Sequence, residues 1–78
     1  FGLNSNHTCE DFRKAPVEAQ INFLMSHEGL TSELQNEMIQ YHLEDKVGDC
    51  FYNKVRKCSG AEPIGDMYRN CAESLSRY

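Results

Sequence analysis

Four cysteines in a chain of 78 residues are the feature that most constrains how this protein can fold. A domain of this size buries only about 60% of the surface that its unfolded chain exposes, so its core is marginal without an added restraint. An even number of cysteines in so short a chain is typical of a disulfide framework in an oxidising compartment. Four reduced core cysteines in a cytosolic protein are the less favoured alternative. We therefore expect one disulfide-stapled domain over residues 1–78.

The beginning of the chain agrees with export. The sequence starts at Phe1 without a methionine and without a basic segment followed by an apolar one. This start is typical of a mature chain whose signal peptide has been removed, which predicts a periplasmic or secreted protein. No run of 18 apolar residues occurs, so we expect no membrane span.

Apolar residues recur at helical spacing along nearly the whole chain, and no segment shows the alternation of a strand. A first helix is predicted over Cys9–Lys14, where Thr8 and Asp11 form a weak capping box. Pro16 suits the first turn of a second helix, and Gly29 is expected to end it. The predicted apolar face of this second helix consists of Val17, Ile21, Leu24 and Met25.

Three further helices follow in the second half of the pattern. Thr31 and Ser32 can cap the third helix. Gly48 interrupts the pattern, so the fourth helix is predicted over residues 50–58, and Pro63 opens the fifth. Their periodic apolar residues are Leu34, Met38, Tyr41, Ile39 and Leu43, then Phe51, Val55 and Cys58, and finally Ile64, Met67, Tyr68, Cys71 and Leu75. The predicted fold is an all-α, compact four- to five-helix mini-domain.

Helix geometry limits how the cysteines can pair. Cys50 and Cys58 would lie about 12 Å apart along one helix, because the rise is about 1.5 Å per residue. A disulfide needs Cα atoms within about 7 Å, so these two cannot bond each other. If the last two helices fold back at the turn over residues 59–62, Cys50 faces Cys71. This leaves Cys9 to pair with Cys58, which ties the first helix to the hairpin.

The spacing of the first cysteine and its surroundings resemble a known family, the small periplasmic acid-stress chaperones of the Hde type (HdeA and HdeB). The matching features are Thr8-Cys9-Glu10-Asp11-Phe12, Pro16, the segment Leu24-Met25-Ser26-His27-Glu28, and Cys58 followed by Pro63. The family joins a Thr-Cys-x-x-Phe helix start by a disulfide to a cysteine about fifty positions later, which Cys9 and Cys58 match. The resemblance implies a compact helical bundle that binds unfolded clients in acid. Cys50 and Cys71 have no counterpart in typical members.

The charge distribution argues against nucleic-acid binding. The net charge is −4, and residues 1–49 contain nine acidic residues against three basic ones. A nucleic-acid-binding domain needs a basic face that displaces counterions. The basic cluster of Lys54, Arg56 and Lys57 is better explained as the solvated face of a helix.

Nothing in the sequence favours catalysis or a metal site. Disulfides over all four cysteines leave no thiol nucleophile, and so small a chain has little room for a substrate cleft. His27 with Glu28, and His42 with Glu44 and Asp45, lack the ligand spacing of a zinc site. We expect a protein without enzymatic activity, cofactor or metal.

Binding remains as the expected role. Apolar side chains exceed what a small core needs: Leu24, Met25, Met38, Met67, Tyr41, Tyr52, Tyr68 and Tyr78. The candidate partner-binding residues are the acidic Glu33, Glu37, Glu44 and Asp45 with the apolar Met25, Met38 and Tyr41. The expected partner is a protein, and a homodimer is a further option. The sequon at Asn6 permits glycosylation in a eukaryotic secreted chain but does not bear on the choice.

Three functions follow from these features. The resemblance implies an acid-activated holdase, whose net charge would rise from −4 to about +11 below about pH 3 and loosen its packing. The alternative is an inhibitor or immunity protein that blocks one exported enzyme or toxin, onto which acidic residues would steer a basic partner. A secreted carrier of apolar ligands is the third, and it requires an internal cavity.

Overall fold

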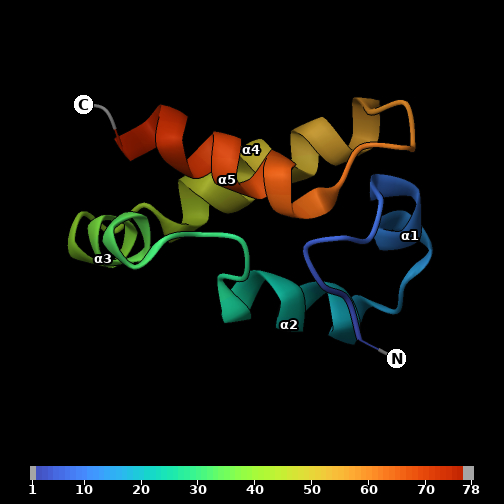
Figure 1. Ribbon diagram of the computed structural model, residues 1–78, viewed down its shortest axis with the longest axis horizontal. Coiled ribbons are helices and arrows are strands. Elements are labelled where there is room, and N and C mark those ends of the chain that lie inside the picture. The colour runs from blue at the N-terminus through green and yellow to red at the C-terminus, as the bar shows by residue number, and fades with distance from the viewer. Residues whose placement is uncertain (1, 77–78) are drawn as a thin grey trace.

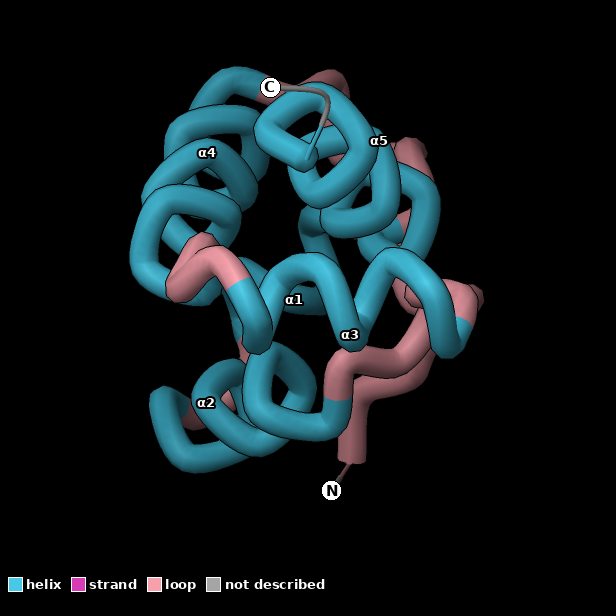
Figure 2. The backbone as a smooth tube through the Cα atoms, turned by 90° about the vertical axis from the view of Figure 1, so that its left-hand side faces the viewer, coloured by secondary structure: helices cyan, strands magenta, loops and turns pink. Residues whose placement is uncertain are grey.

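A computed structural model describes residues 2–76, so Phe1 and Tyr78 lie outside the described residues. The helices are α1 (Cys9–Lys14), α2 (Val17–Ser26), α3 (Ser32–Gln40), α4 (Glu44–Lys57) and α5 (Ile64–Ser76). Helices α4 and α5 lie side by side, α2 lies on the opposite side, and α1 and α3 lie between these two layers (Figures 1 and 2). The predicted all-α class is confirmed, and between residues 2 and 76 the one strand-like feature is an isolated bridge between Thr8 and Pro63.

The two disulfides pair as predicted. Cys9 bonds Cys58, and Cys50 bonds Cys71, with Cα atoms 6.8 Å and 5.9 Å apart. The first bond ties α1 to the residue that follows α4, and the second joins the middle of α4 to α5. Disulfides of this kind form and persist in oxidising compartments, which agrees with an extracellular or periplasmic location.

Helix α1 begins as the sequence predicts. The backbone N–H of Asp11 donates to Thr8 Oγ1 at 3.2 Å, and the backbone N–H of Thr8 donates to Asp11 Oδ2 at 3.1 Å. This reciprocal pair is a complete capping box. The hydrogen bond from the Thr8 backbone holds the pKa of Asp11 below its usual value, with the charge of His7 and Lys14 as smaller causes.

The predicted start of the fourth helix is wrong. Helix α4 begins at Glu44 and continues through Gly48, which was expected to interrupt it. A glycine inside a helix costs about 1 kcal/mol relative to alanine. Val47, Phe51 and Val55 form one fully buried stripe across that position, and burying each such side chain contributes about 1.5–3 kcal/mol. Burial of this stripe therefore outweighs the glycine.

The predicted apolar face of the second helix points inward only at Leu24, which packs against the core. Ala19 and Phe23 are buried, whereas Val17, Ile21 and Met25 are 68%, 46% and 71% exposed. The two sets lie about half a turn apart on the helix. Phe23 decides the orientation because its ring packs among other core aromatic rings. Gly29 does not end α2, since the helix ends at Ser26 and His27 takes the left-handed conformation, with φ at 54°.

The third and fifth helices largely follow the predicted patterns. Thr31 caps α3 through the backbone N–H of Leu34, and Leu34 and Met38 are buried. Of the other three predicted apolar positions, Leu43 packs against the core, whereas Ile39 and Tyr41 are 52% and 61% exposed. In α5 the predicted apolar residues Ile64, Met67, Tyr68 and Cys71 are buried, and Leu75 packs against the core.

Aromatic rings form the centre of the core. Phe12 of α1 lies edge-on to Phe51 of α4, with ring centroids 5.0 Å apart. Phe23 lies 5.9 Å from Phe51 and 6.0 Å from Tyr68. Within residues 2–76 no charged residue is buried, whereas the polar hydroxyl of Tyr68 and Oγ of Ser5 are shielded from solvent. The core therefore consists of apolar and aromatic side chains whose packing brings α2 against α4 and α5.

The N-terminal segment is held mainly through its backbone. The N–H of Ile64 donates to the carbonyl of His7 at 2.8 Å, and the N–H of Gly65 donates to that of Ser5 at 3.1 Å. A side chain at Gly65 would collide with Ser5. Glycine at this position is thus required by the close approach of the segment to the start of α5.

Candidate functional site

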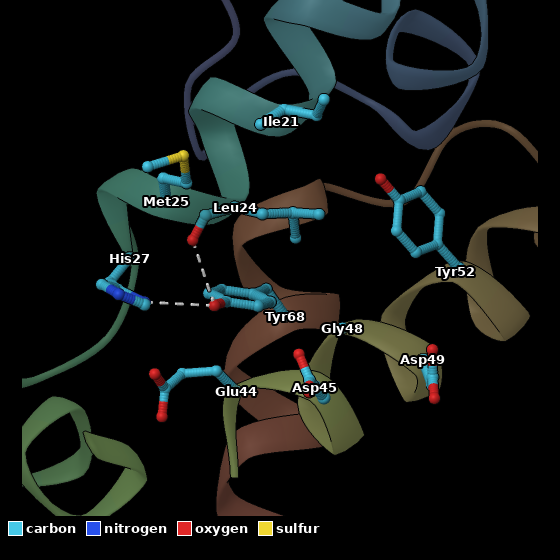
Figure 3. A pocket seen from close by; sticks show the side chains of 10 residues that line it. All are labelled: Ile21, Leu24, Met25, His27, Glu44, Asp45, Gly48, Asp49, Tyr52 and Tyr68. Atoms are coloured by element: carbon cyan, nitrogen blue, oxygen red, sulfur yellow. Dashed lines mark hydrogen bonds between the residues drawn. The ribbon is translucent and has the colours of Figure 1, made fainter. Parts of the chain in front are cut away.

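A surface groove lies between α2 and α4, with a volume of about 680 Å³. Its lining residues are Ile21, Leu24, Met25, His27, Glu44, Asp45, Gly48, Asp49, Tyr52 and Tyr68 (Figure 3). Most of these side chains are exposed, so the groove is open to solvent and is not an enclosed cavity.

The wall formed by α2 is apolar. Ile21 and Met25 face solvent here because Ala19 and Phe23 turn the opposite side of the helix into the core. Leu24 is half-buried at the base of the same wall. Unbranched methionine adapts to partners of different shape. The orientation of α2, which the sequence pattern did not predict, is therefore the reason that this wall exists.

The wall formed by α4 is acidic. Gly48, Asp49 and Tyr52 lie three, four and seven positions after Asp45, so the four residues share one face of the helix. Glu44 adds a third carboxylate in the first turn. No lysine or arginine occurs among the residues that line the groove. The apolar wall of α2 thus faces the negatively charged wall of α4.

The floor of the groove is the hydroxyl of Tyr68 from α5. This hydroxyl donates to the carbonyl of Leu24 at 3.3 Å and lies 3.2 Å from Nδ1 of His27 (Figure 3). The contact with Nδ1 of His27 is a second hydrogen bond of the same hydroxyl group. Burial, with a smaller contribution from the charge of Glu44, raises the pKa of Tyr68 to about 12. Tyr68 therefore stays neutral and links α2 to α5.

The predicted binding residues do not form one surface. Met25, Glu44 and Asp45 come together in the groove. Glu33 and Glu37 lie on α3, in a separate shallow depression that they share with α5 residues.

Two apolar candidates lie outside the groove lining as well. Met38 is only 1% exposed and packs beneath the hydroxyl of Tyr68, so it offers no surface to a partner in this fold. Tyr41 is exposed just after α3 and does not line the groove.

Sequence patterns did not indicate four of the groove residues as parts of a binding site: Ile21, His27, Gly48 and Asp49. Ile21 was predicted only as part of an apolar helix face, His27 was considered only as a metal ligand, and Gly48 was expected to interrupt the helix. The spacing of Asp45, Gly48, Asp49 and Tyr52 would have placed all four on one face had α4 been predicted to begin earlier.

The described residues contain neither a metal site nor a thiol nucleophile. Between residues 2 and 76 no group of three or more His, Cys, Asp or Glu side chains could hold a metal ion. All four cysteines are in disulfides. None of the described helices is long and apolar enough to cross a membrane.

Comparison with known proteins identifies no relative of this chain. No protein-family model matches the sequence, and neither a curated protein nor a solved structure matches it significantly. The groove is therefore the feature from which a function can be inferred.

Proposed function

We propose that this chain is a non-catalytic protein-binding domain of an oxidising compartment, of the inhibitor or immunity type, which binds one exported protein through the α2–α4 groove. The observation that carries this proposal is the pairing of an exposed apolar wall with an acidic wall that includes no basic side chain. A partner surface that presents apolar and basic side chains complements both walls.

Electrostatics support a basic partner. Glu44, Asp45 and Asp49 are exposed on one side of α4, and the net charge of the chain is −4. Surface charge of one sign speeds the encounter with a partner of the opposite sign and disfavours partners of the same sign. Apolar contact with Ile21 and Met25 would then supply most of the affinity.

The proposal is tested with two charge-reversal variants that have the same net charge. Asp45→Lys with Asp49→Lys changes the groove, and Glu33→Lys with Glu37→Lys changes an acidic pair at the same spacing outside it. Each pair moves the net charge from −4 to 0, because two acidic residues become basic. Each pair also includes one residue in the first turn of its helix, so helix-dipole effects are matched.

These variants are used to capture partners from the exported proteins of the source cells at neutral pH. We expect one protein to bind wild type and the Glu33/Glu37 variant in a fixed stoichiometry and to be lost from the Asp45/Asp49 variant. If the bound protein stays with the groove variant, or if no protein binds in a fixed ratio, the proposal is wrong.

A second candidate, the acid-activated holdase, draws support from the apolar side chains on the surface. Val17, Met25, Ile39 and Tyr41 are each more than half exposed. Acid would add strong positive charge and increase repulsion within the domain. The holdase proposal is tested by light scattering of a denaturing client at about pH 2–3, where suppression of aggregation is expected. Unchanged scattering would exclude it.

The groove proposal is preferred because acid has little to disrupt in this fold. Acid unfolds proteins mainly by protonating carboxylates that are paired or hydrogen-bonded in the native state. Asp11 and Glu28 accept hydrogen bonds from the backbone N–H groups of Thr8 and Ser5, and both carboxylates are exposed. The ion pairs of the described residues, Lys14 with Glu10 and Arg69 with Asp66 and Glu73, are exposed as well. Exposed pairs contribute only about 0–1 kcal/mol each. The groove, in contrast, is already formed without acid.

A further inference from the structure

We infer that the groove takes an apolar segment of a partner protein that carries an arginine or lysine side chain, and that Gly48 is the position where this segment comes against the backbone of α4. This inference rests on the proposed function and specifies the chemistry of the partner. It depends on three independent features of the groove: its glycine, its carboxylates and its apolar wall.

Gly48 has no structural reason to be a glycine. It lies inside α4, is not among the residues with positive φ, and an added Cβ would meet nothing within 4 Å. Gly65, by contrast, is required by contact with Ser5. A glycine in the middle of a helix destabilises it, yet nothing in the described fold uses the space above Gly48. The open space faces the groove, which explains the glycine as a site of close approach by a ligand (Figure 3).

The side chains around Gly48 favour a cation. Asp45 precedes it by three positions and Asp49 follows it directly, so a group seated over the glycine lies near both carboxylates. The ring of Tyr52, one turn further along α4, is held by contacts with Phe12 and Phe51 at 5.9 Å and 6.2 Å. Carboxylates bind guanidinium and ammonium groups, and an aromatic face attracts the same cations.

The opposite wall requires that the cation be carried by an apolar segment. Ile21 and Met25 are 46% and 71% exposed, and Leu24 lines the same wall. A simple cation in solution would leave this apolar surface in water. A purely apolar ligand would instead remove water from the carboxylates of Asp45 and Asp49 without pairing them, which is costly.

The inference is tested with a synthetic amphipathic helical peptide of leucine and arginine and with its twin in which every arginine is glutamate. Binding to the full-length, oxidised protein is followed by backbone amide chemical shifts at neutral pH. We expect the arginine peptide to shift residues of α2 and α4 that line the groove in a saturable manner, and the glutamate twin to bind at least tenfold more weakly.

The variant Gly48→Ala separates recognition from folding. Alanine at this position has room and favours the helix, so the melting temperature should rise by about 4–8 °C. The affinity for the arginine peptide should nevertheless fall at least tenfold, because the methyl group occupies the contact space. Asn70→Ala serves as the control, since it also raises helix propensity at an exposed helical position but does not line the groove.

Several outcomes would contradict the inference. Equal affinity of wild type and Gly48→Ala would overturn the role of Gly48, and equal binding of the two peptides would overturn the preference for a cation. Shifts confined to residues outside the groove, or no binding of either peptide, would overturn the proposed chemistry of the segment. None of these results decides the proposed function, which fails only if capture from exported proteins finds no partner that depends on the groove.

Discussion

The two sides of this molecule are held together in different ways. On one side, both disulfides join α1, α4 and α5, and α4 packs along α5 (Figure 1). On the other side, α2 has no disulfide and no side-chain cap at its beginning. It is attached by the packing of Phe23 and by two hydrogen-bonding side chains, Gln20 to the carbonyl of Phe12 and Tyr68 to that of Leu24. The candidate groove lies between these two sides.

This difference explains why covalent restraint and apolar exposure occur in different places. The disulfides stabilise the α1, α4 and α5 side without using more apolar surface, so α2 does not need to bury Val17, Ile21 and Met25 for the domain to fold. These side chains remain available to a partner.

The largest expected effect is the loss of the long-range disulfide. Replacing Cys9 and Cys58 together by serine releases a loop of 49 positions, which the chain-entropy model values at about 4 kcal/mol. Replacing Cys50 and Cys71 releases a loop of 21 positions and should cost about 3 kcal/mol. Urea unfolding of both variants measures the difference. If the Cys50/Cys71 variant is the less stable one, the bond within the hairpin is the main restraint.

Sequence patterns predicted much of the disulfide-linked side, here called the stapled side (α1, α4 and α5). Cysteine spacing and helix geometry together sufficed to pair the cysteines and to place α1 and α5. The start of α4 was missed because Gly48 was judged by its local propensity, whereas burial of Val47, Phe51 and Val55 decides the outcome. The contact of the N-terminal segment with Gly65 was missed for another reason. It is formed by backbone hydrogen bonds, which leave no side-chain pattern.

The groove was the least predictable part. Four apolar residues at helical spacing predicted the apolar face of α2, but only Leu24 among them packs against the core, and the buried residues are Phe23 and Ala19. Counting apolar residues gives each equal weight, whereas an aromatic ring that contacts three others in a core buries more surface and gains ring-to-ring contacts. In the sequence, only their charge marks Glu44 and Asp45 as candidate binding residues. Their position opposite an apolar wall results from the orientation of α2.

The second prediction tests this orientation directly. Phe23→Ala should destabilise the domain by about 3 kcal/mol, since it removes a buried ring that contacts Phe12, Phe51 and Tyr68. Met25→Ala, on the exposed face of the same helix, should change stability by less than about 0.5 kcal/mol. Chemical unfolding followed by far-ultraviolet circular dichroism measures both. Equal losses would mean that both faces of α2 are covered.

The smallest effect concerns the polar link between the two sides. Tyr68→Phe removes the hydroxyl that contacts Leu24 and His27, and should cost about 1 kcal/mol. Tyr41→Phe is the matched control, because Tyr41 is 61% exposed and should change stability little.

The pH dependence of the free energy of unfolding is a second test of the Tyr68 hydroxyl. Burial raises the pKa of Tyr68 to about 12 in the folded protein, against 10.0 for the ordinary side chain. A group whose pKa is raised by folding contributes stability that is complete below its unfolded pKa and is lost as the pH rises through its folded pKa. The free energy of unfolding of wild type should therefore fall between about pH 10 and 12. The decline should be shallower in Tyr68→Phe and unchanged in Tyr41→Phe. An equal decline in wild type and Tyr68→Phe would mean that this hydroxyl does not connect α2 to the stapled side, and that the aromatic core alone holds the groove open.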